Sequence, residues 1–255
     1  MKRNWNILNW NIRGINDPKK WDALSNKIAE SNCSILCLQE TKRELFDTSY
    51  IRKFCPKNIS KFEFLPSIGA SGGLLIAWND NLFSGQLEHL NDFSLTIKFT
   101  CKLSGTMWKL TNIYGPCQQD ARTVFLDWFK EFHVGDDVNW LVLGDFNYIR
   151  YPHNRNQDGG NLNDMLLFTE AINNQALVEI PLKGRKFTWS NMQDAPLLEK
   201  LDWIFTSSEW INDHPNTMAF PLAKISSYHV PINLQLDTKV PKSNIFRFEE
   251  FWADF

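Results

Sequence analysis

Three features that mark special classes of protein are missing from this sequence. The five cysteines are an odd number and include no Cys-x-x-Cys pair, so a zinc site is not indicated. No run of about 18 apolar residues is present, so no segment should span a membrane. The first residues also lack the long apolar core of a signal peptide. We therefore expect a protein of the cytoplasm or nucleus whose cysteines are free, buried thiols.

The sequence also lacks a strong charge of either sign. Its 27 Lys and Arg residues nearly balance 29 Asp and Glu residues, and the formal net charge is −2. This balance excludes the global basic surface that many nucleic-acid-binding domains carry. If the protein binds DNA, it must use a local patch or metal ions that bridge to phosphate. A nuclease remains compatible with the balance, because it needs carboxylates to hold its metal.

What the sequence does contain is a large apolar fraction, with 43% hydrophobic residues and eleven Trp. Such a chain buries large rings in a core and does not stay disordered. At 255 residues the length alone allows one large domain or two small ones. The strand-like pattern is lost beyond Pro241. We therefore predict one domain over residues 1–240 and, over 241–255, a linker or the start of a following segment.

Short apolar runs typical of strands recur along the chain and alternate with a few stretches of helical spacing. This mixture predicts sheet-on-sheet packing flanked by helices. A doubly wound parallel sheet fits less well, because the connections after Leu74 are too short for helical crossovers. The expected helices are 18–30, 121–132 and 164–173, and the expected strands are 5–12, 34–38, 74–78, 94–99, 107–114, 140–143, 186–189, 201–205 and 230–236.

Several of these apolar strands are followed by an acidic or amide side chain. Asn11, Glu40, Asp145 and Asp202 each stand at such a position, and Asn147 follows Asp145 closely. Polar groups at the ends of buried strands can converge at one edge of a sheet and build a site on a rigid base. Their oxygens suit a hard cation such as Mg²⁺.

Each residue taken alone also has a purely structural interpretation. Asn11 could start a turn, Glu40 could stand at a helix N-terminus, and residues 144–147 could be a turn closed by Asx hydrogen bonds. His229 could be a hydrogen-bonded core histidine. The combination of these residues in this order is what points to a site.

The combination resembles the motif series of the endonuclease/exonuclease/phosphatase superfamily, which includes DNase I and abasic-site endonucleases. The resemblance extends over roughly residues 4–236. The matching motifs are LNWNIRG (8–14), LQET (38–41), NIYGP (112–116), GDFN (144–147), FTWS (187–190), KLD (200–202) and SYH (227–229).

Three shorter runs resemble a narrower group, the endonuclease domains of plant LINE-type (non-LTR) retrotransposon polyproteins. They are SGGL (71–74), FTWSN (187–191) and FRFE (246–249). This resemblance implies a monomeric domain that nicks DNA to prime reverse transcription. It also implies binding to the phosphate backbone of DNA and a reverse transcriptase domain downstream in the full polyprotein.

The superfamily resemblance implies a DNase I-like α/β fold, a four-layer sandwich of two packed mixed β-sheets flanked by helices. The site would lie at the common edge of the sheets. Glu40 would bind Mg²⁺, or Mn²⁺ in its place, with Asn11 close beside it and also near the substrate. Asp145 would orient or deprotonate the attacking water. Asn147 would donate a hydrogen bond to the scissile phosphate, and Tyr114 would steady it.

The remaining roles fall on residues near the C-terminal end of the resemblance. His229 would contact a phosphate oxygen, and Asp202 would hold its imidazole in one tautomer. Thr188 and Ser227 would be supporting polar contacts to substrate.

One position departs from the superfamily pattern, because its last motif is Ser-Asp-His and this chain has Tyr228 in the middle. A phenol is a poor ligand for a hard cation, and loss of such a partner typically costs about 10–100-fold in metal affinity or activity. We therefore expect reduced or lost activity. Two other interpretations remain open: a phosphatase or RNA deadenylase on the same fold, and a catalytically dead nucleic-acid-binding relic.

Overall fold

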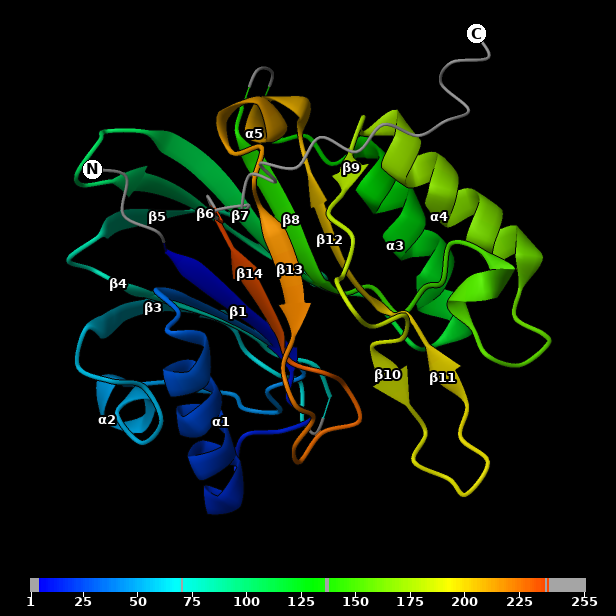
Figure 1. Ribbon diagram of the computed structural model, residues 1–255, viewed down its shortest axis with the longest axis horizontal. Coiled ribbons are helices and arrows are strands. Elements are labelled where there is room, and N and C mark those ends of the chain that lie inside the picture. The colour runs from blue at the N-terminus through cyan, green and yellow to red at the C-terminus, as the bar shows by residue number, and fades with distance from the viewer. Residues whose placement is uncertain (1–4, 70, 136–137, 237, 239–255) are drawn as a thin grey trace, which may run out of the picture.

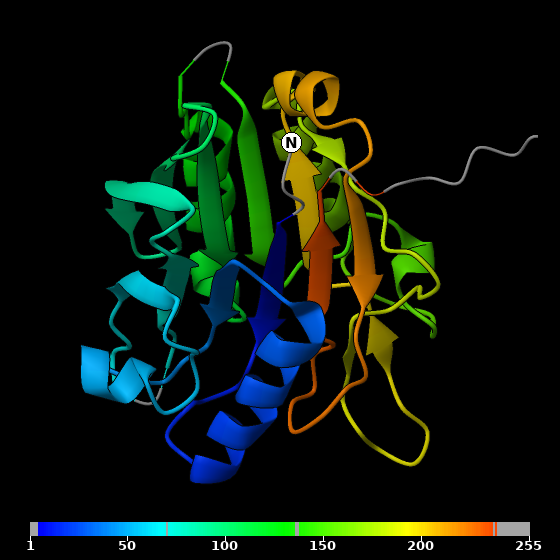
Figure 2. The same cartoon turned by 60° about the vertical axis from the view of Figure 1, so that its left-hand side comes forward.

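Two six-stranded β-sheets lie face to face in the computed structural model, and helices cover both outer faces (Figure 1). The structure describes residues 5–69, 71–135, 138–236 and 238. The same layers are visible in a second view (Figure 2), in which the helix α1 (Pro18–Ser31) lies in front of one of the sheets. The predicted four-layer sandwich of two mixed sheets is confirmed.

The first sheet has the strand order β13-β14-β1-β2-β4-β3. Among the described strands of this sheet only β1 and β2 run parallel, and the helix α1 connects them. Its strands are β1 (Asn6–Asn11), β2 (Ile35–Gln39), β3 (Ile59–Leu65), β4 (Leu74–Asn79), β13 (Met218–Pro221) and β14 (Ile232–Gln235).

The second sheet has the order β5-β6-β7-β8-β12-β9, with β7 and β8 parallel. A short separate hairpin, β10 with β11, lies beyond the lower ends of β8 and β12 in Figure 1. The strands are β5 (Phe83–Asn91), β6 (Ser94–Cys101), β7 (Met107–Tyr114), β8 (Trp140–Asp145), β9 (Val178–Glu179), β10 (Trp189–Ser190), β11 (Leu198–Glu199) and β12 (Asp202–Thr206).

Side-chain hydrogen bonds cap the N-termini of four of the described α-helices, whereas α3 (Gln119–Glu131) begins without one. The helix α1 shows this well, because Asp17 accepts a hydrogen bond from the backbone N–H of Lys19, Pro18 opens the first turn, and Asn32 closes the helix in a left-handed conformation. The helices are α1 (Pro18–Ser31), α2 (Thr48–Ile51), α3 (Gln119–Glu131), the 3₁₀ turn η1 (Pro152–Asn154), α4 (Leu162–Asn174) and α5 (Ser208–Asp213).

Three apolar layers fill the spaces between the four structural layers. Alternate residues of the central strands point to opposite faces, so Ile7 packs between the sheets while Leu8 and Trp10 pack against α1. In the second sheet Leu141 faces the first sheet, and Val142 faces the layer of α3 and α4. Both faces of each central strand are therefore buried, which explains the continuous apolar runs in the sequence.

Some expectations from the sequence need correction. The strand predicted at 186–189 is wrong, because only Trp189 of that stretch lies in a strand, the short β10. Cys33, Cys37 and Cys55 are buried, but Cys117 is exposed, so the prediction of buried thiols fails there. The sequence pattern does not indicate the edge strands β3, β5, β9 and β13, because most of their residues are exposed or only partly buried and lack a continuous apolar run.

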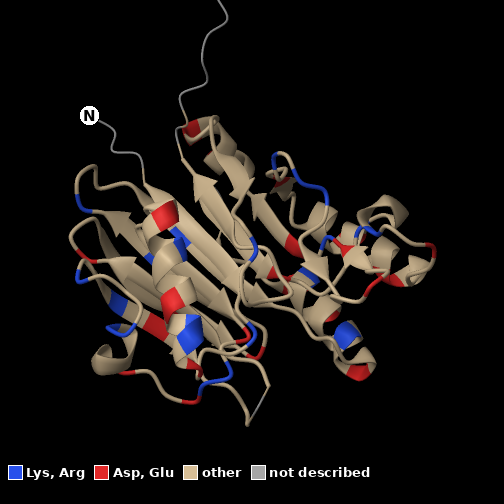
Figure 3. Ribbon diagram, turned by 60° about the horizontal axis from the view of Figure 1, so that its bottom comes forward, with Lys and Arg blue, Asp and Glu red and all other residues tan. Residues whose placement is uncertain are grey.

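Two further expectations concern the surface and the chain end. Lys and Arg segments are interspersed with Asp and Glu segments over the molecule, in keeping with the near-zero net charge (Figure 3). None of the helices in the described part of the chain combines the length and the apolar character needed to cross a bilayer. The predicted linker at 241–255 falls outside the described residues.

Candidate active site

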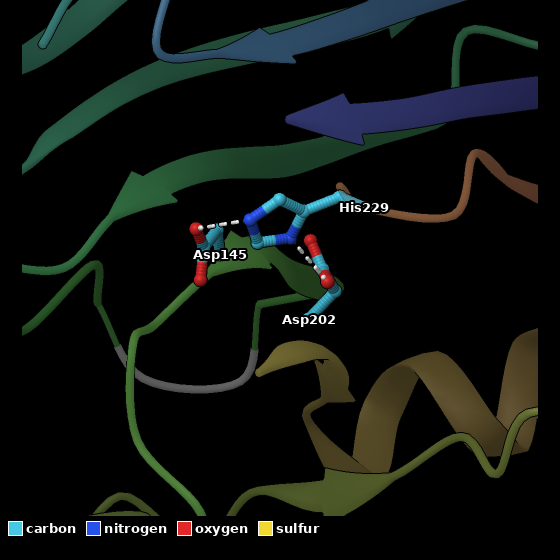
Figure 4. Close-up of side chains that lie close together, drawn as sticks. All are labelled: Asp145, Asp202 and His229. Carbon is cyan, nitrogen blue, oxygen red and sulfur yellow. Dashed lines mark hydrogen bonds and ion pairs between the residues drawn. The ribbon is translucent and has the colours of Figure 1, made fainter. Parts of the chain in front are cut away.

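A buried histidine lies between two buried carboxylates at one end of the second sheet. Asp145 ends β8, Asp202 begins β12, and the two residues face each other across the antiparallel pair. His229 approaches from the segment that precedes β14 (Figure 4). One ligand atom from each of the three side chains lies within 4.8 Å of the others. Residues predicted from three distant stretches of the chain are therefore in contact.

The imidazole of His229 contacts a different carboxylate with each nitrogen. Its Nδ1 lies 2.9 Å from Oδ2 of Asp202, and its Nε2 lies 3.5 Å from Oδ2 of Asp145. Burial by itself would lower the pKa of His229, but Asp202 first and Asp145 second outweigh it and raise the pKa to about 9. The histidine is therefore held as an imidazolium at neutral pH, with its Nδ1–H directed at Asp202.

The pKa of Asp145 is also shifted, because its carboxylate is buried. Desolvation raises its pKa to about 7, and His229 and a hydrogen bond from Asn11 oppose this only in part. Asn11 donates its amide N–H to Oδ2 at 2.7 Å, and the backbone N–H of Asn147 donates to Oδ1 at 3.0 Å. A carboxylate with a pKa near neutrality is suited to accept a proton at physiological pH.

The ends of β7 and β8 lie close together and bring Tyr114 next to Asp145. Tyr114 pairs beside Asp145 in the parallel register, and the N–H of Gly115 donates to the carbonyl of Asp145 at 2.7 Å. A Cβ at Gly115 would lie 2.0 Å from the carbonyl oxygen of Phe146, so only glycine allows this approach. Close packing against the backbone of Phe146 therefore explains why the NIYGP motif has a glycine at this position. The side-chain amide of Asn147 donates to the Gly115 carbonyl from the other side, at 2.7 Å.

Two hydroxyls that the sequence suggested as substrate contacts are instead used within the protein. Thr188 is fully buried, and its oxygen accepts hydrogen bonds from the backbone N–H groups of Leu201 and Asp202 at 3.0 Å each. Ser227 donates to the carbonyl of Asn11 at 2.7 Å and accepts from the N–H of His229 at 3.2 Å. Both hydroxyls therefore fix the backbone beside Asp202 and His229.

A pocket of about 400 Å³ opens in front of this cluster. Asp202 lies behind His229 and does not line it. The pocket wall includes Glu40, Tyr114, Asp145, Asn147, Tyr228 and His229.

Glu40 reaches the pocket but lies outside the buried cluster. It follows β2 with a left-handed φ of 53°, and its carboxylate is 3.0 Å from the amine of Lys42 and 3.9 Å from Nε of Arg13. Because Glu40 and Asp145 both present oxygens to one pocket, the donor set fits a hard divalent cation. Lys42 and Arg13 would compete with that cation for Glu40.

Asp202 and Asn11 also carry oxygen atoms near the cluster, and these two residues differ in whether the oxygens are already hydrogen-bonded. Oδ1 of Asp202 is buried and has no hydrogen-bond partner among the described residues. The amide of Asn11 is already engaged, since its oxygen accepts from the N–H of Arg13 at 3.1 Å while its nitrogen donates to Asp145. Asn11 therefore acts mainly on Asp145 in this arrangement.

Arg122 is a residue of the site that the sequence did not suggest. It lines the pocket from α3, forms an ion pair with Asp164 at 2.9 Å, and donates to the carbonyl of Asn147 at 2.9 Å. Its guanidinium lies 3.8 Å from the centre of the Tyr148 ring. It holds the turn after β8 in place. Arginines are common on the polar face of an amphipathic helix, so the sequence gives no reason to assign Arg122 to the site, and its tertiary contacts are needed to recognise it.

The raised pKa of His229 predicts a loss of stability at alkaline pH. Its contribution should be fully present below the unfolded value of about 6.5 and lost as pH rises through about 9, which amounts to roughly 3 kcal/mol. Urea unfolding between pH 6 and 9.5 measures this. His229→Gln should reduce the fall, and His153→Gln, which removes an exposed imidazole, is the control. A stability that stays constant over this range would contradict the arrangement.

Comparison with known proteins shows what this architecture is similar to. The profile of the Endonuclease/Exonuclease/phosphatase family matches residues 8–229. No curated protein sequence matches the chain. Among solved structures, AP endonuclease LMAP from Leishmania major superimposes with a TM-score of 0.72 at 16% identity, covering 93% of this chain and 89% of that one.

Two further solved structures have the same fold. The endonuclease domain of TRAS1, a telomere-specific non-LTR retrotransposon, gives a TM-score of 0.67 at 12% identity and covers 92% of this chain and 98% of that one. A mannosyl-6-phosphatase from Bacteroides thetaiotaomicron gives 0.58 at 13% identity, covering 92% and 100%. At these identities the similarity shows the fold alone.

Proposed function

This chain belongs to the endonuclease/exonuclease/phosphatase family, and we propose that it is a metal-dependent phosphodiesterase that nicks DNA. The observation that carries the proposal is the position of the His229 imidazole, 2.9 Å from Asp202 and 3.5 Å from Asp145, at the back of a pocket that Glu40 also lines. In this proposal Asp145 is a proton acceptor and His229 a cationic donor, and the two side chains lie next to each other. Hydrolysis of a phosphodiester needs both, one for the attacking water and one for the charge that develops on phosphate oxygens.

Each residue has a distinct task in this proposal. Asp145, with its pKa near neutrality, orients the attacking water and accepts its proton. His229 donates from Nε2 to a phosphate oxygen, while Asp202 fixes the imidazole and stabilises its charge. Tyr114 and Asn147 line the pocket beside Asp145 and steady the phosphate.

Glu40, with Asn11 nearby, would hold the divalent cation, for which we propose Mg²⁺ with Mn²⁺ as the alternative. When bound, the cation supplies a positive charge that neutralises the phosphate in the transition state. Tyr228 cannot assist as a carboxylate would, and Lys42 and Arg13 already neutralise Glu40. We therefore propose that the activity is reduced.

DNA is the proposed substrate because two lines of similarity agree. The motifs resemble those of LINE-type retrotransposon endonucleases, and two of the structural neighbours are described as an AP endonuclease and a retrotransposon endonuclease domain. As the finer proposal, the nick would prime reverse transcription by a polymerase domain of the same polyprotein. The phosphatase alternative is supported by the mannosyl-6-phosphatase of the same fold.

A paired substrate assay tests the function. We expect the chain to convert supercoiled plasmid to the open circular form in Mg²⁺, with EDTA abolishing the reaction. Mannose 6-phosphate and inositol phosphates should release no inorganic phosphate under the same conditions. Release of phosphate without nicking would favour the phosphatase alternative. DNA binding with no cleavage, even in the Tyr228→Asp variant, would favour a dead nucleic-acid-binding relic.

A further inference from the structure

Tyr228 places an aromatic ring at the mouth of the catalytic pocket. The residue is 40% exposed and lines the same pocket as its neighbour His229. The guanidinium of Arg13 lies 3.9 Å from the centre of the ring and therefore covers one face of it. Arg13 is itself partly exposed, with 37% of its side-chain surface accessible. The pair presents a flat, cationic and aromatic surface beside the proposed position of the scissile phosphate.

The backbone on both sides of this pair is held in place. The carbonyl of Tyr228 accepts a hydrogen bond from the N–H of Ser190 at 3.1 Å, which ties the segment to β10. The amine of Lys20 donates to the carbonyls of Ser226 and Ile12, so one side chain links the segments that carry Tyr228 and Arg13. A surface fixed in this way loses little conformational entropy when a ligand binds to it.

The backbone of Arg13 connects this surface to the catalytic carboxylate. Arg13 has a left-handed φ of 50°, and its N–H donates to the side-chain oxygen of Asn11 at 3.1 Å. The amide nitrogen of the same Asn11 donates to Asp145. The ring, the guanidinium and the catalytic carboxylate are thus parts of one connected unit, and a ligand that contacts the first two is close to the third.

We propose that Tyr228 and Arg13 form a stacking platform for a nucleobase adjacent to the phosphate bound in the pocket. The inference rests on the proposed phosphodiesterase function and names its substrate class as a nucleic acid strand. A phenol contributes little to a hard cation, but its ring and an arginine both stack well on bases of any sequence. A small phosphoester such as a sugar phosphate has no flat π face and gains nothing from the platform.

The side chain at position 228 can stack on a base or assist a metal ion, but not both. With tyrosine the position binds the strand by stacking and does not need a metal ion. With aspartate, as in the family pattern, it assists the metal and repels the strand. Strand affinity without metal and cleavage with metal should therefore change in opposite directions when Tyr228 is replaced by Asp.

Equilibrium binding in EDTA tests the platform. The probe is a fluorescein-labelled single-stranded oligonucleotide, compared at one salt concentration with a strand of equal length whose internal residues are abasic. Both strands carry the same phosphates, so only base contacts distinguish them. The wild-type chain should bind the normal strand about tenfold more tightly than the abasic strand. Tyr228→Phe should keep this ratio, and Tyr228→Leu should reduce it towards one.

Tyr151→Leu is the matched control, because Tyr151 has a similar exposure of 39% and does not line the pocket. It should leave the ratio unchanged, and circular dichroism of each variant verifies folding. Equal affinity of the wild-type chain for both strands would overturn the platform, as would an equal loss in Tyr151→Leu. Plasmid nicking in Mg²⁺ is scored separately, so a chain that stacks bases without cutting contradicts the proposed function and leaves the platform standing.

Discussion

Replacement of Asp145 by Asn is expected to lower the rate of plasmid nicking by about 10²–10⁴-fold, the range typical of a lost general base. The substitution keeps the size of the side chain and one oxygen that can accept hydrogen bonds. It removes the group that accepts the proton of the attacking water, and it removes one of the two carboxylates that stabilise the imidazolium of His229. The other two carboxylates that line the pocket among the described residues are already paired, Glu40 with Lys42 and Glu199 with Arg155, so neither is free to take this place.

The stability of the same variant separates a catalytic role from a structural one. Burial raises the pKa of Asp145 to about 7, so above that pH the ionised carboxylate is less favourable in the folded protein than in the unfolded chain. A neutral amide avoids this cost, but it offers one acceptor to the N–H groups of Asn11 and Asn147 and no charge to His229, so Asp145→Asn should remain folded at pH 8 with a stability close to that of the wild-type chain. Asp158→Asn, in an exposed loop, is the control for the loss of one negative charge. Nicking at the wild-type rate by a folded Asp145→Asn variant would refute the assignment.

Replacement of Tyr228 by Asp is expected to raise both metal affinity and nicking by about 10–100-fold, the effect typical of a restored partner at a metal site. The new carboxylate would lie at the mouth of the pocket that Glu40 and Asp145 line. It would also attract Arg13, which now stacks on the tyrosine ring 3.9 Å away, and so reduce the competition for Glu40.

Two measurements examine this second expectation. Titration calorimetry with Mn²⁺ reports metal affinity without any need for catalysis, and a plasmid assay over a range of Mg²⁺ concentrations reports turnover. Tyr228→Asn is the matched control, because it has the shape of aspartate without the charge and should gain much less. If the Asp and Asn variants bind Mn²⁺ no better than the wild-type chain, the tyrosine is not what limits the metal site.

Much of the fold could be predicted from the sequence because the central strands are buried on both faces. Runs such as 140–143 and 35–38 are continuously apolar, and a continuous apolar run bounded by turn residues is a strong strand signal. The edge strands β3 and β5 gave no such signal, since solvent covers part of each. The stretch 186–189 misled the prediction, because Phe187 and Trp189 alternate as in a strand while the chain forms only the short β10.

The proximity of Asp145, Asp202 and His229 could also be predicted, but the hydrogen-bond partners of the polar side chains around them could not. Asp145 and Asp202 stand directly at strand ends, and adjacent strands necessarily bring such ends together. The direction of a hydroxyl has no comparable rule. The hydroxyl of Thr188 points inward because the backbone N–H groups of Leu201 and Asp202 need an acceptor. Its orientation depends on how the segment before β10 packs against the start of β12.

The layers of this protein and the chemical groups at its strand ends could be predicted from the amino-acid sequence, because hydrophobic periodicity is a local property of a chain. Which groups meet depends on the packing of segments far apart in the sequence: Arg13 stacks on Tyr228, and Arg122 donates to the carbonyl of Asn147 in the turn after β8. The physical reason is that ionic and stacking contacts require atoms within about 4 Å, a distance set by the packing of remote segments and by no pattern along the chain.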